Sequence, residues 1–133
     1  MQMAQKGKTG RTFAFGQELW YTRKKKRGRM CMEIRKGTLK DLEAIAAVEA
    51  ACFPAAEAAT AEEFAGRLQQ YGDHFWLLWE GERLLAFVDG FCTDWPDLTD
   101  EMYADASLHR ENGAWQMIFG VNTIPACRRQ GYA

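Results

Sequence analysis

The last ten residues of the chain, Ile124–Ala133, carry the pattern best suited to chemistry. They read IPACRRQGYA and follow an apolar segment that ends at Thr123. A glycine-containing turn after a strand exposes successive backbone N–H groups that can hydrogen-bond a pyrophosphate, and a following helix N-terminus adds about half a positive charge. Gly131 permits close approach of a ligand, while Arg128 and Arg129 can pair with its phosphates or remain solvated. The pattern predicts a binding loop for a phosphate-bearing ligand.

The segment before this loop, Trp115–Thr123, has the character of one continuous strand. An isolated glycine inside a strand often marks a β-bulge or the close approach of another backbone. Gly120 is therefore expected to have one of these roles, and a glycine that merely packs is the alternative.

The cysteines argue against a metal centre. Cys31, Cys52, Cys92 and Cys127 are widely spaced, and none belongs to a CxxC pair or has a histidine cluster beside it in the sequence. Zinc sites usually show such spacing. The sequence therefore predicts no metal, and unpaired cysteines are typical of a cytoplasmic protein.

Length and composition limit the size and the class of the protein. A chain of 133 residues that is 47% hydrophobic can bury one core of moderate size. No stretch approaches the roughly 20 apolar residues of a spanning helix, and the apolar piece 12–16 is too short for a secretory signal. We expect a soluble, cytoplasmic domain without membrane contact.

Charge divides the chain into two unlike parts. Residues 1–31 hold nine basic side chains and one acid, a charge of +8, and the remainder carries −9. The basic part shows no periodicity, so it is predicted to be a disordered leader. Its run 23–29 could contact nucleic acid through phosphates, but a solvated tail is favoured.

Residues 32–72 predict a strand followed by two helices. Met32–Lys36 alternates as a short strand would, and Thr38 stands at a helix cap with Asp41 three residues on. A helix that ends near Cys52 should follow. Thr60 and Glu63 then form a capping box for a second helix that stops at Gly72.

Residues 74–123 predict a hairpin, a surface excursion and a last strand. Apolar runs at 74–79 and 84–93 flank a polar turn, which indicates a β-hairpin. Residues 94–113 are polar and mixed, with one helical turn expected within 98–106. Trp76, Trp79, Phe87 and Phe91 are expected in the core, and His74 is expected to be a half-buried structural residue. The order of the predicted strands and helices indicates an α/β domain in which helices flank a sheet.

The terminal loop resembles the coenzyme loop of the GCN5-related N-acetyltransferase (GNAT) family, written (Gln or Arg)-x-x-Gly-x-(Gly or Ala). Arg128, Gly131 and Ala133 fill its three fixed positions. The resemblance extends over residues 32–133 in element order. Segments 52–54, 57–59 and 99–102 look most like bacterial relatives of arylalkylamine N-acetyltransferases.

The resemblance implies a fold and a coenzyme site. The fold would be a mixed, mainly antiparallel sheet flanked by helices, in the order β-α-α-β-β-β and then the loop, without the later helix and strands of the family. Residues 32–133 would form the N-terminal part of the domain. The coenzyme would be acetyl-CoA. Its pantetheine arm would pair with backbone groups of Val121 and Thr123 while the Asn122 side chain points away. Its phosphates would meet Arg128, Arg129, Gln130, Gly131, Tyr132 and Ala133.

The implied reaction is direct acetyl transfer to a primary amine of a small molecule, without metal and with a general base. Arylalkylamine enzymes place two histidines on the strand before the loop, where this chain has Met117 and Phe119. Glu57 is the first alternative base, acting through a bound water, and Asp89 and His109 follow. The acidic body of the domain would suit a cationic amine.

Other interpretations follow from the elements the family has beyond this loop. The chain is expected to be a fragment of an enzyme, with completion by a partner or a swapped copy, or loss of catalysis, as alternatives. A catalytically inactive domain that binds CoA or a protein is the alternative function. An unpaired sheet edge would favour a homodimer.

Overall fold

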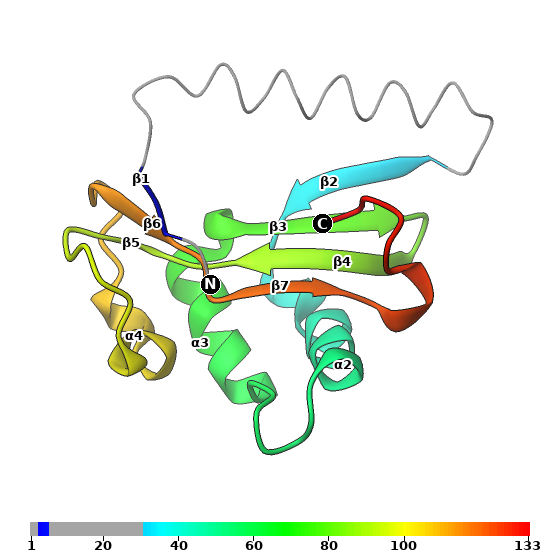
Figure 1. Cartoon of the computed structure of the whole chain (residues 1–133), viewed down its shortest axis with the longest axis horizontal. Coiled ribbons are helices and arrows are strands. Elements are labelled where there is room, and N and C mark those ends of the chain that lie inside the picture. Colours follow the sequence, from blue (N-terminus) through cyan, green and yellow to red (C-terminus); the bar gives the residue numbers. More distant parts are fainter. Residues whose placement is uncertain (1–2, 6–30) are drawn as a thin grey trace.

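A computed structural model describes residues 3–5 and 31–133 of the chain (Figure 1). Its strands are β1 (Met3–Gln5), β2 (Met32–Lys36), β3 (Phe75–Glu80), β4 (Arg83–Asp89), β5 (Cys92–Thr93), β6 (Trp115–Met117) and β7 (Gly120–Thr123). Its helices are α2 (Leu42–Cys52), α3 (Ala61–Tyr71) and α4 (Asp100–Ala104), joined by 3-10 helices at Leu39–Asp41, Gly72–His74, Ala106–Leu108 and Pro125–Cys127.

The strands form two antiparallel groups that continue into one another. The larger has the order β2-β3-β4-β7 and the smaller the order β1-β6-β5. Helices α2 and α3 lie together on one side of the larger sheet (Figure 1). The predicted α/β fold, with a mainly antiparallel sheet flanked by helices, is confirmed.

Helix ends follow the caps expected from the sequence. The Thr60 hydroxyl accepts a hydrogen bond from the Glu63 N–H at 3.2 Å, and the Glu63 carboxylate accepts one from the Thr60 N–H at 2.7 Å. Thr38 and Asp41 make a second capping box, with 2.9 Å from the Thr38 N–H to the Asp41 carboxylate. The Arg35 guanidinium also holds Asp41, at 3.0 Å.

The main core lies between the helices and the sheet. Among its fully buried members are Ile45, Phe64, Phe75, Leu77, Phe87, Phe91 and Met117. Trp79 belongs to it as expected, but the prediction for Trp76 is wrong. Trp76 is half-buried on the opposite face of β3, where the Lys36 ammonium lies 4.4 Å from its ring centroid. Alternation along the strand sends Trp76 away from its core neighbours Phe75 and Leu77.

Two predicted strands are each broken, which corrects the sequence interpretation. Segment 84–93 divides into β4 and β5, and segment 115–123 into β6 and β7. Asp89 pairs with Gly120 while Cys92 pairs with Gln116, so the second strand carries one extra residue between these pairs. This is a β-bulge, and it bends the sheet at that point.

The glycine that this bulge requires is Gly90. A Cβ at Gly90 would lie 1.7 Å from the Met117 carbonyl oxygen, a contact that no side chain can tolerate. Gly120, by contrast, has no such backbone contact, and its role is described below. A bulge with a glycine was therefore expected in the right region of the sheet, but the glycine that it requires is Gly90 and not Gly120.

Three residues of the predicted leader form a strand. Met3–Gln5 is β1 and pairs antiparallel with β6. Residues 1–2 and 6–30, including the basic run 23–29, lie outside the described residues. None of the helices in the described parts is long and apolar enough to cross a membrane.

Candidate coenzyme and acyl-transfer site

Strand β7 forms one border of the larger sheet, because β4 is its pairing partner and the described residues place no strand on its other side. The backbone of Val121, whose side chain is 55% exposed, is therefore at the edge where the pantetheine arm was predicted to pair. The Thr123 carbonyl is already engaged. It accepts hydrogen bonds from Arg128 Nε at 3.1 Å and from the Cys52 thiol at 3.3 Å. A coenzyme that used this carbonyl would have to displace Arg128.

The loop after β7 begins with the 3-10 helix Pro125–Cys127 and then turns sharply. Arg129 and Gly131 have positive φ angles of 62° and 78°. The left-handed conformation costs a residue with a side chain roughly 1–2 kcal/mol but costs glycine little. A Cβ at Gly131 would meet nothing within 4 Å, so conformation and not space calls for glycine here.

The side chains of the loop divide between solvent and the sheet. Arg128, Arg129, Gln130, Gly131 and Ala133 are exposed. Tyr132 is half-buried and packs against a small cluster of Met32, Leu78, Leu85 and Ala86, on the face of the sheet opposite α2 and α3. Tyr132 thus anchors the loop, and the exposed members face solvent, where they can meet phosphates.

A buried ion pair lies between α3 and β4. Arg67 Nη1 donates to the Asp89 carboxylate at 3.0 Å, and the two side chains are only 6% and 2% exposed. Arg67 Nη2 donates to the Tyr103 carbonyl at 3.1 Å, while Arg67 Nε is buried without a hydrogen-bond partner among the described residues. Burial raises the pKa of Asp89 to about 6, although the Arg67 charge opposes this shift. Asp89, a candidate base from the sequence, is therefore held in a buried ion pair.

A second buried acid joins this pair from α2. Glu49 accepts hydrogen bonds from the Asn122 side-chain amide of β7 and, at 3.0 Å, from the Ala59 N–H. A Cβ at Gly120 would lie 3.1 Å from Asn122 Oδ1 and 3.3 Å from Asp89 Oδ1. Gly120 is thus the packing glycine of the alternative prediction, and its missing side chain leaves space for two polar groups. The Asn122 side chain points toward α2, where Glu49 lies.

Sequence reasoning missed Glu49, Arg67 and Asn122 as members of this cluster. A signal was present for the first two. Glu49 falls on the apolar stripe of α2 beside Ile45 and Val48, and Arg67 falls on the stripe of α3 between Phe64 and Leu68. A charge inside an apolar stripe indicates a buried partner, but the partners are distant in sequence.

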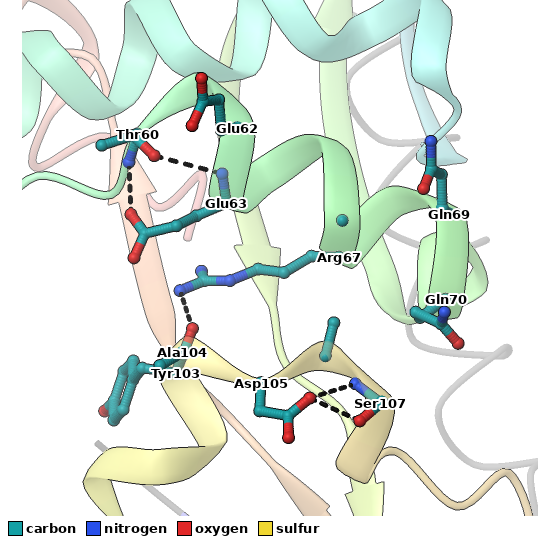
Figure 2. Close-up of a pocket in the computed structure, with 12 residues that line it drawn as sticks. Thr60, Glu62, Glu63, Arg67, Gln69, Gln70, Tyr103, Ala104, Asp105 and Ser107 are labelled. Atoms are coloured by element: carbon teal, nitrogen blue, oxygen red, sulfur yellow. Dashed lines mark hydrogen bonds between the residues drawn. The ribbon is translucent and has the colours of Figure 1, made fainter.

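A polar cavity of about 380 Å³ opens where α3 faces the segment 103–107 (Figure 2). Figure 2 shows the Arg67 side chain crossing this space toward the backbone of Tyr103 and Ala104. Glu62, Glu63 and Asp105 add three carboxylates to its walls. The only basic side chain in the lining is Arg67, which is already paired with Asp89. The cavity therefore favours a cationic occupant.

The other base candidates are separated in the fold. Glu57 is exposed in the turn between α2 and α3, where its N–H donates to the Pro54 carbonyl. Met117 and Phe119 are buried in the main core, so the two histidine positions of arylalkylamine enzymes are apolar here. His109 belongs to a different cluster at the β5–β6 end of the sheet.

That cluster is a set of hydrogen-bonded polar side chains around buried Cys92. His74, expected to be half-buried, is buried and contacts Gln116 at 2.6 Å and Glu111 at 2.9 Å. Burial alone would lower the pKa of His74, but hydrogen bonds with Cys92, Glu111 and Gln116 outweigh it and raise the pKa to about 9. His109, a candidate base from the sequence, has a side chain only 9% exposed and also contacts Glu111, at 2.9 Å.

Comparison with known proteins supports the fold. No family model matches the sequence, and no curated protein matches it significantly. The loading GNATL domain of CurA from Lyngbya majuscula superposes with a TM-score of 0.67 and 21% identity, over 76% of this chain and 52% of that one. The GphF GNAT-like decarboxylase, solved in complex with isobutyryl-CoA, gives a TM-score of 0.66 and 26% identity, over 75% and 52%.

The chain has a GNAT-like fold. It spans about half the length of both similar structures. Strand β7 and the loop after it are the segments in which the coenzyme site is predicted from the sequence. The resemblance to GNAT proteins is confirmed at the level of the fold.

Proposed function

We propose that this chain binds an acyl-CoA along the β7 edge and the loop that follows it, and that it transfers an acetyl group to a primary amine. The observation that carries the proposal is the loop itself. In a GNAT-like fold, a strand edge without a partner among the described residues leads directly into a turn whose Gly131 is left-handed and surrounded by open space. Backbone N–H groups in such a turn can approach phosphates closely.

One of the similar structures supports an acyl-CoA as the ligand. GphF is described in complex with isobutyryl-CoA, and it shares 26% identity with this chain. Acetyl-CoA is proposed here because the loop resembles that of the N-acetyltransferases. Arg128 is expected to exchange its contact with the Thr123 carbonyl for a phosphate when the coenzyme binds, since charge-assisted bonds to phosphate are stronger.

The acidic cavity supports a cationic amine as the acceptor. Glu62, Glu63 and Asp105 would attract an ammonium group, and the reaction then requires removal of one proton before attack on the thioester. We propose Glu57 as the base, through a bound water, because its carboxylate is exposed next to α3. Asp89 is too buried to exchange protons with a bound amine directly, and its role is to hold Arg67.

A calorimetric titration of acetyl-CoA into the 133-residue chain tests the coenzyme site. Gly131→Glu should abolish binding, because it adds a negative charge and strains a left-handed position. Gly131→Asn is the matched control, since asparagine tolerates this conformation without charge and should retain binding. Equal binding by all three proteins would place the coenzyme elsewhere.

Release of CoA thiol tests the transfer step. With aryl- and polyamines present, the wild-type chain should release thiol, and Glu57→Gln should reduce the rate about 100-fold or more, as loss of a general base does. Binding without thiol release would favour the alternative of an inactive CoA-binding domain.

A second activity has support of its own. One similar structure is described as a decarboxylase, and Met117 and Phe119 leave the strand before the loop without a basic side chain. Loss of CO2 from a carboxylated acyl-CoA needs no proton removed from an acceptor. Release of CO2 from malonyl-CoA, without any amine, would identify this reaction in place of amine acetylation.

A further inference from the structure

Three segments distant in the sequence bring metal-ligating side chains together at the β5–β6 end of the sheet. His74 ends a 3-10 helix after α3, Cys92 begins β5, and His109 and Glu111 lie on the connection to β6. Ligand atoms of His74, Cys92 and His109 all lie within 4.8 Å of one another. Glu111 Oε2 is 2.9 Å from Nε2 of both histidines.

Hydrogen bonds determine which nitrogen of His74 faces a ligand. The Gln116 amide nitrogen donates to the carbonyls of Met117 at 2.9 Å and Phe91 at 3.3 Å, so its oxygen must face His74 Nδ1, 2.6 Å away. Nδ1 therefore carries a proton and donates it to Gln116. Metal-binding histidines are usually oriented in this way, with the second nitrogen left to hold the ion.

The same reasoning gives His109 a supporting role. Its Nδ1 accepts a hydrogen bond from the Cys92 N–H at 3.1 Å, so the proton of the neutral ring is on Nε2. That N–H donates to the Glu111 carboxylate. Both nitrogens of His109 are thus committed, and the ring holds the carboxylate in place rather than binding an ion itself.

We propose that His74 Nε2, Cys92 Sγ and the Glu111 carboxylate bind a divalent metal ion of the zinc class, with Gln116 and His109 orienting the ligands. Nitrogen, thiolate and carboxylate ligands are the set that zinc accepts. Tetrahedral Zn²⁺ separates a nitrogen and a sulfur ligand by about 3.5 Å. Glu111 Oε2 lies 2.9 Å from His74 Nε2, and Cys92 Sγ lies 3.9 Å from Nε2 and 3.6 Å from Nδ1. Binding of the ion therefore requires the Cys92 side chain to turn toward Nε2.

The chemistry of binding is an exchange of protons for the ion. The Cys92 thiol proton and the proton between His74 Nε2 and Glu111 leave to solvent, and water supplies the remaining ligand. An entry path is present. Cys92 is fully buried, whereas the Glu111 side chain is 67% exposed and can move aside. The ion would tie the end of α3 to β5 and to the β6 connection.

The sequence predicts no metal site, because the three proposed ligands are far apart in the sequence. His74, Cys92 and Glu111 have none of the short spacings that identify zinc sites, because each stands on a different element. Only the fold brings them together. The site lies outside the proposed coenzyme loop, so it can be tested independently of catalysis.

Cobalt(II) added to the metal-free full chain provides the test, because thiolate ligation gives Co²⁺ a charge-transfer absorption in the near ultraviolet. The wild-type chain should show this band, and Zn²⁺ should abolish it by competition. Cys92→Ser should remove the band. Cys31→Ser and Cys127→Ser are matched controls that should keep it, since these cysteines are exposed or half-buried at other places.

Two further variants distinguish ligands from supporting residues. Glu111→Gln changes an exposed side chain and should fold, so a Co²⁺ affinity equal to that of the wild type would contradict its role as ligand. His109→Phe should retain the thiolate band but weaken affinity by about 10–100-fold, as loss of an orienting partner does. Absence of the band in the wild-type chain, or its persistence in Cys92→Ser, would overturn the proposal.

Discussion

At the residue scale, the buried acids beneath β7 are the most consequential side chains of the domain. Arg67 neutralises Asp89, while Glu49 shares the amide of Asn122. Removing carboxylates from water is costly, and burial accordingly favours the protonated form of Asp89. The cluster therefore makes stability depend on pH in a direction opposite to that of an ordinary salt-bridged acid.

We predict that the free energy of unfolding falls as pH rises from about 4 to about 6. The pKa of Asp89 is about 6 in the folded chain and 3.8 as the ordinary value, so the folded state binds the extra proton in this window. The contribution of Asp89 to the free energy of unfolding is fully present below about pH 4 and is lost above about pH 6. Its size is on the order of 1–3 kcal/mol, at about 1.4 kcal/mol per pKa unit.

Urea denaturation across this pH range measures the effect, with Asp89→Asn as the comparison. The variant should be less stable overall, because Arg67 loses its charged partner. Its profile should nevertheless lack the decline between pH 4 and 6 that the wild type shows. Parallel profiles for the two proteins would mean that Asp89 titrates normally.

Sequence reasoning at this scale succeeded where partners are close in the chain. The capping pairs Thr60–Glu63 and Thr38–Asp41 are three residues apart, and local geometry determines their contact. Arg67 and Asp89 are 22 residues apart, so their contact depends on how α3 packs on β4. No local pattern encodes that packing.

At the scale of elements, the bulge between β4–β5 and β6–β7 shapes the sheet. The chain was predicted to have two long strands here, because residues 84–93 and 115–123 are both mostly apolar. A bulge depends on the backbone of the partner strand, which the sequence of either strand alone does not show. The helices were predicted more closely, since their caps and periodicity are local.

We predict that Gly90→Ala destabilises the domain by about 3 kcal/mol or more, because its Cβ would collide with the Met117 carbonyl. Gly66→Ala is the matched control. Gly66 lies inside α3 with open space around it, so alanine there should stabilise by about 0.5–1 kcal/mol through helix propensity. Thermal and urea unfolding of both variants would measure this contrast. Similar stability for the two would contradict the assigned bulge.

At the scale of the whole molecule, different elements cover the two faces of the sheet. One face packs against α2 and α3, whereas the other carries Tyr132, Cys127 and Ile124 over a small cluster and leaves Ile34 and Val121 exposed. Order of elements and fold class could be predicted from apolar patterning. Which face the terminal loop covers could not, because both faces of β3 and β4 carry large apolar residues.

The β7 edge leads to the last prediction, a homodimer formed through this edge. The described residues place no strand beside this edge, so β7 presents backbone groups to a second copy, and Val121, which is 55% exposed, adds apolar surface. Val121→Lys should shift a concentration-dependent dimer toward monomer, since an edge lysine opposes strand pairing. Leu39→Lys, at a 49% exposed position on a different element, should leave the dimer unchanged.

Light scattering during gel filtration would report the mass of each variant over a range of concentrations. The same edge is proposed to pair with the pantetheine arm, so acetyl-CoA and a second copy should compete for it. Saturating acetyl-CoA is therefore expected to lower the dimer fraction of the wild-type chain and to have little effect on Gly131→Glu. A dimer that persists in Val121→Lys, or that coenzyme strengthens, would mean that the copies associate through another surface and that β7 is open to coenzyme in both.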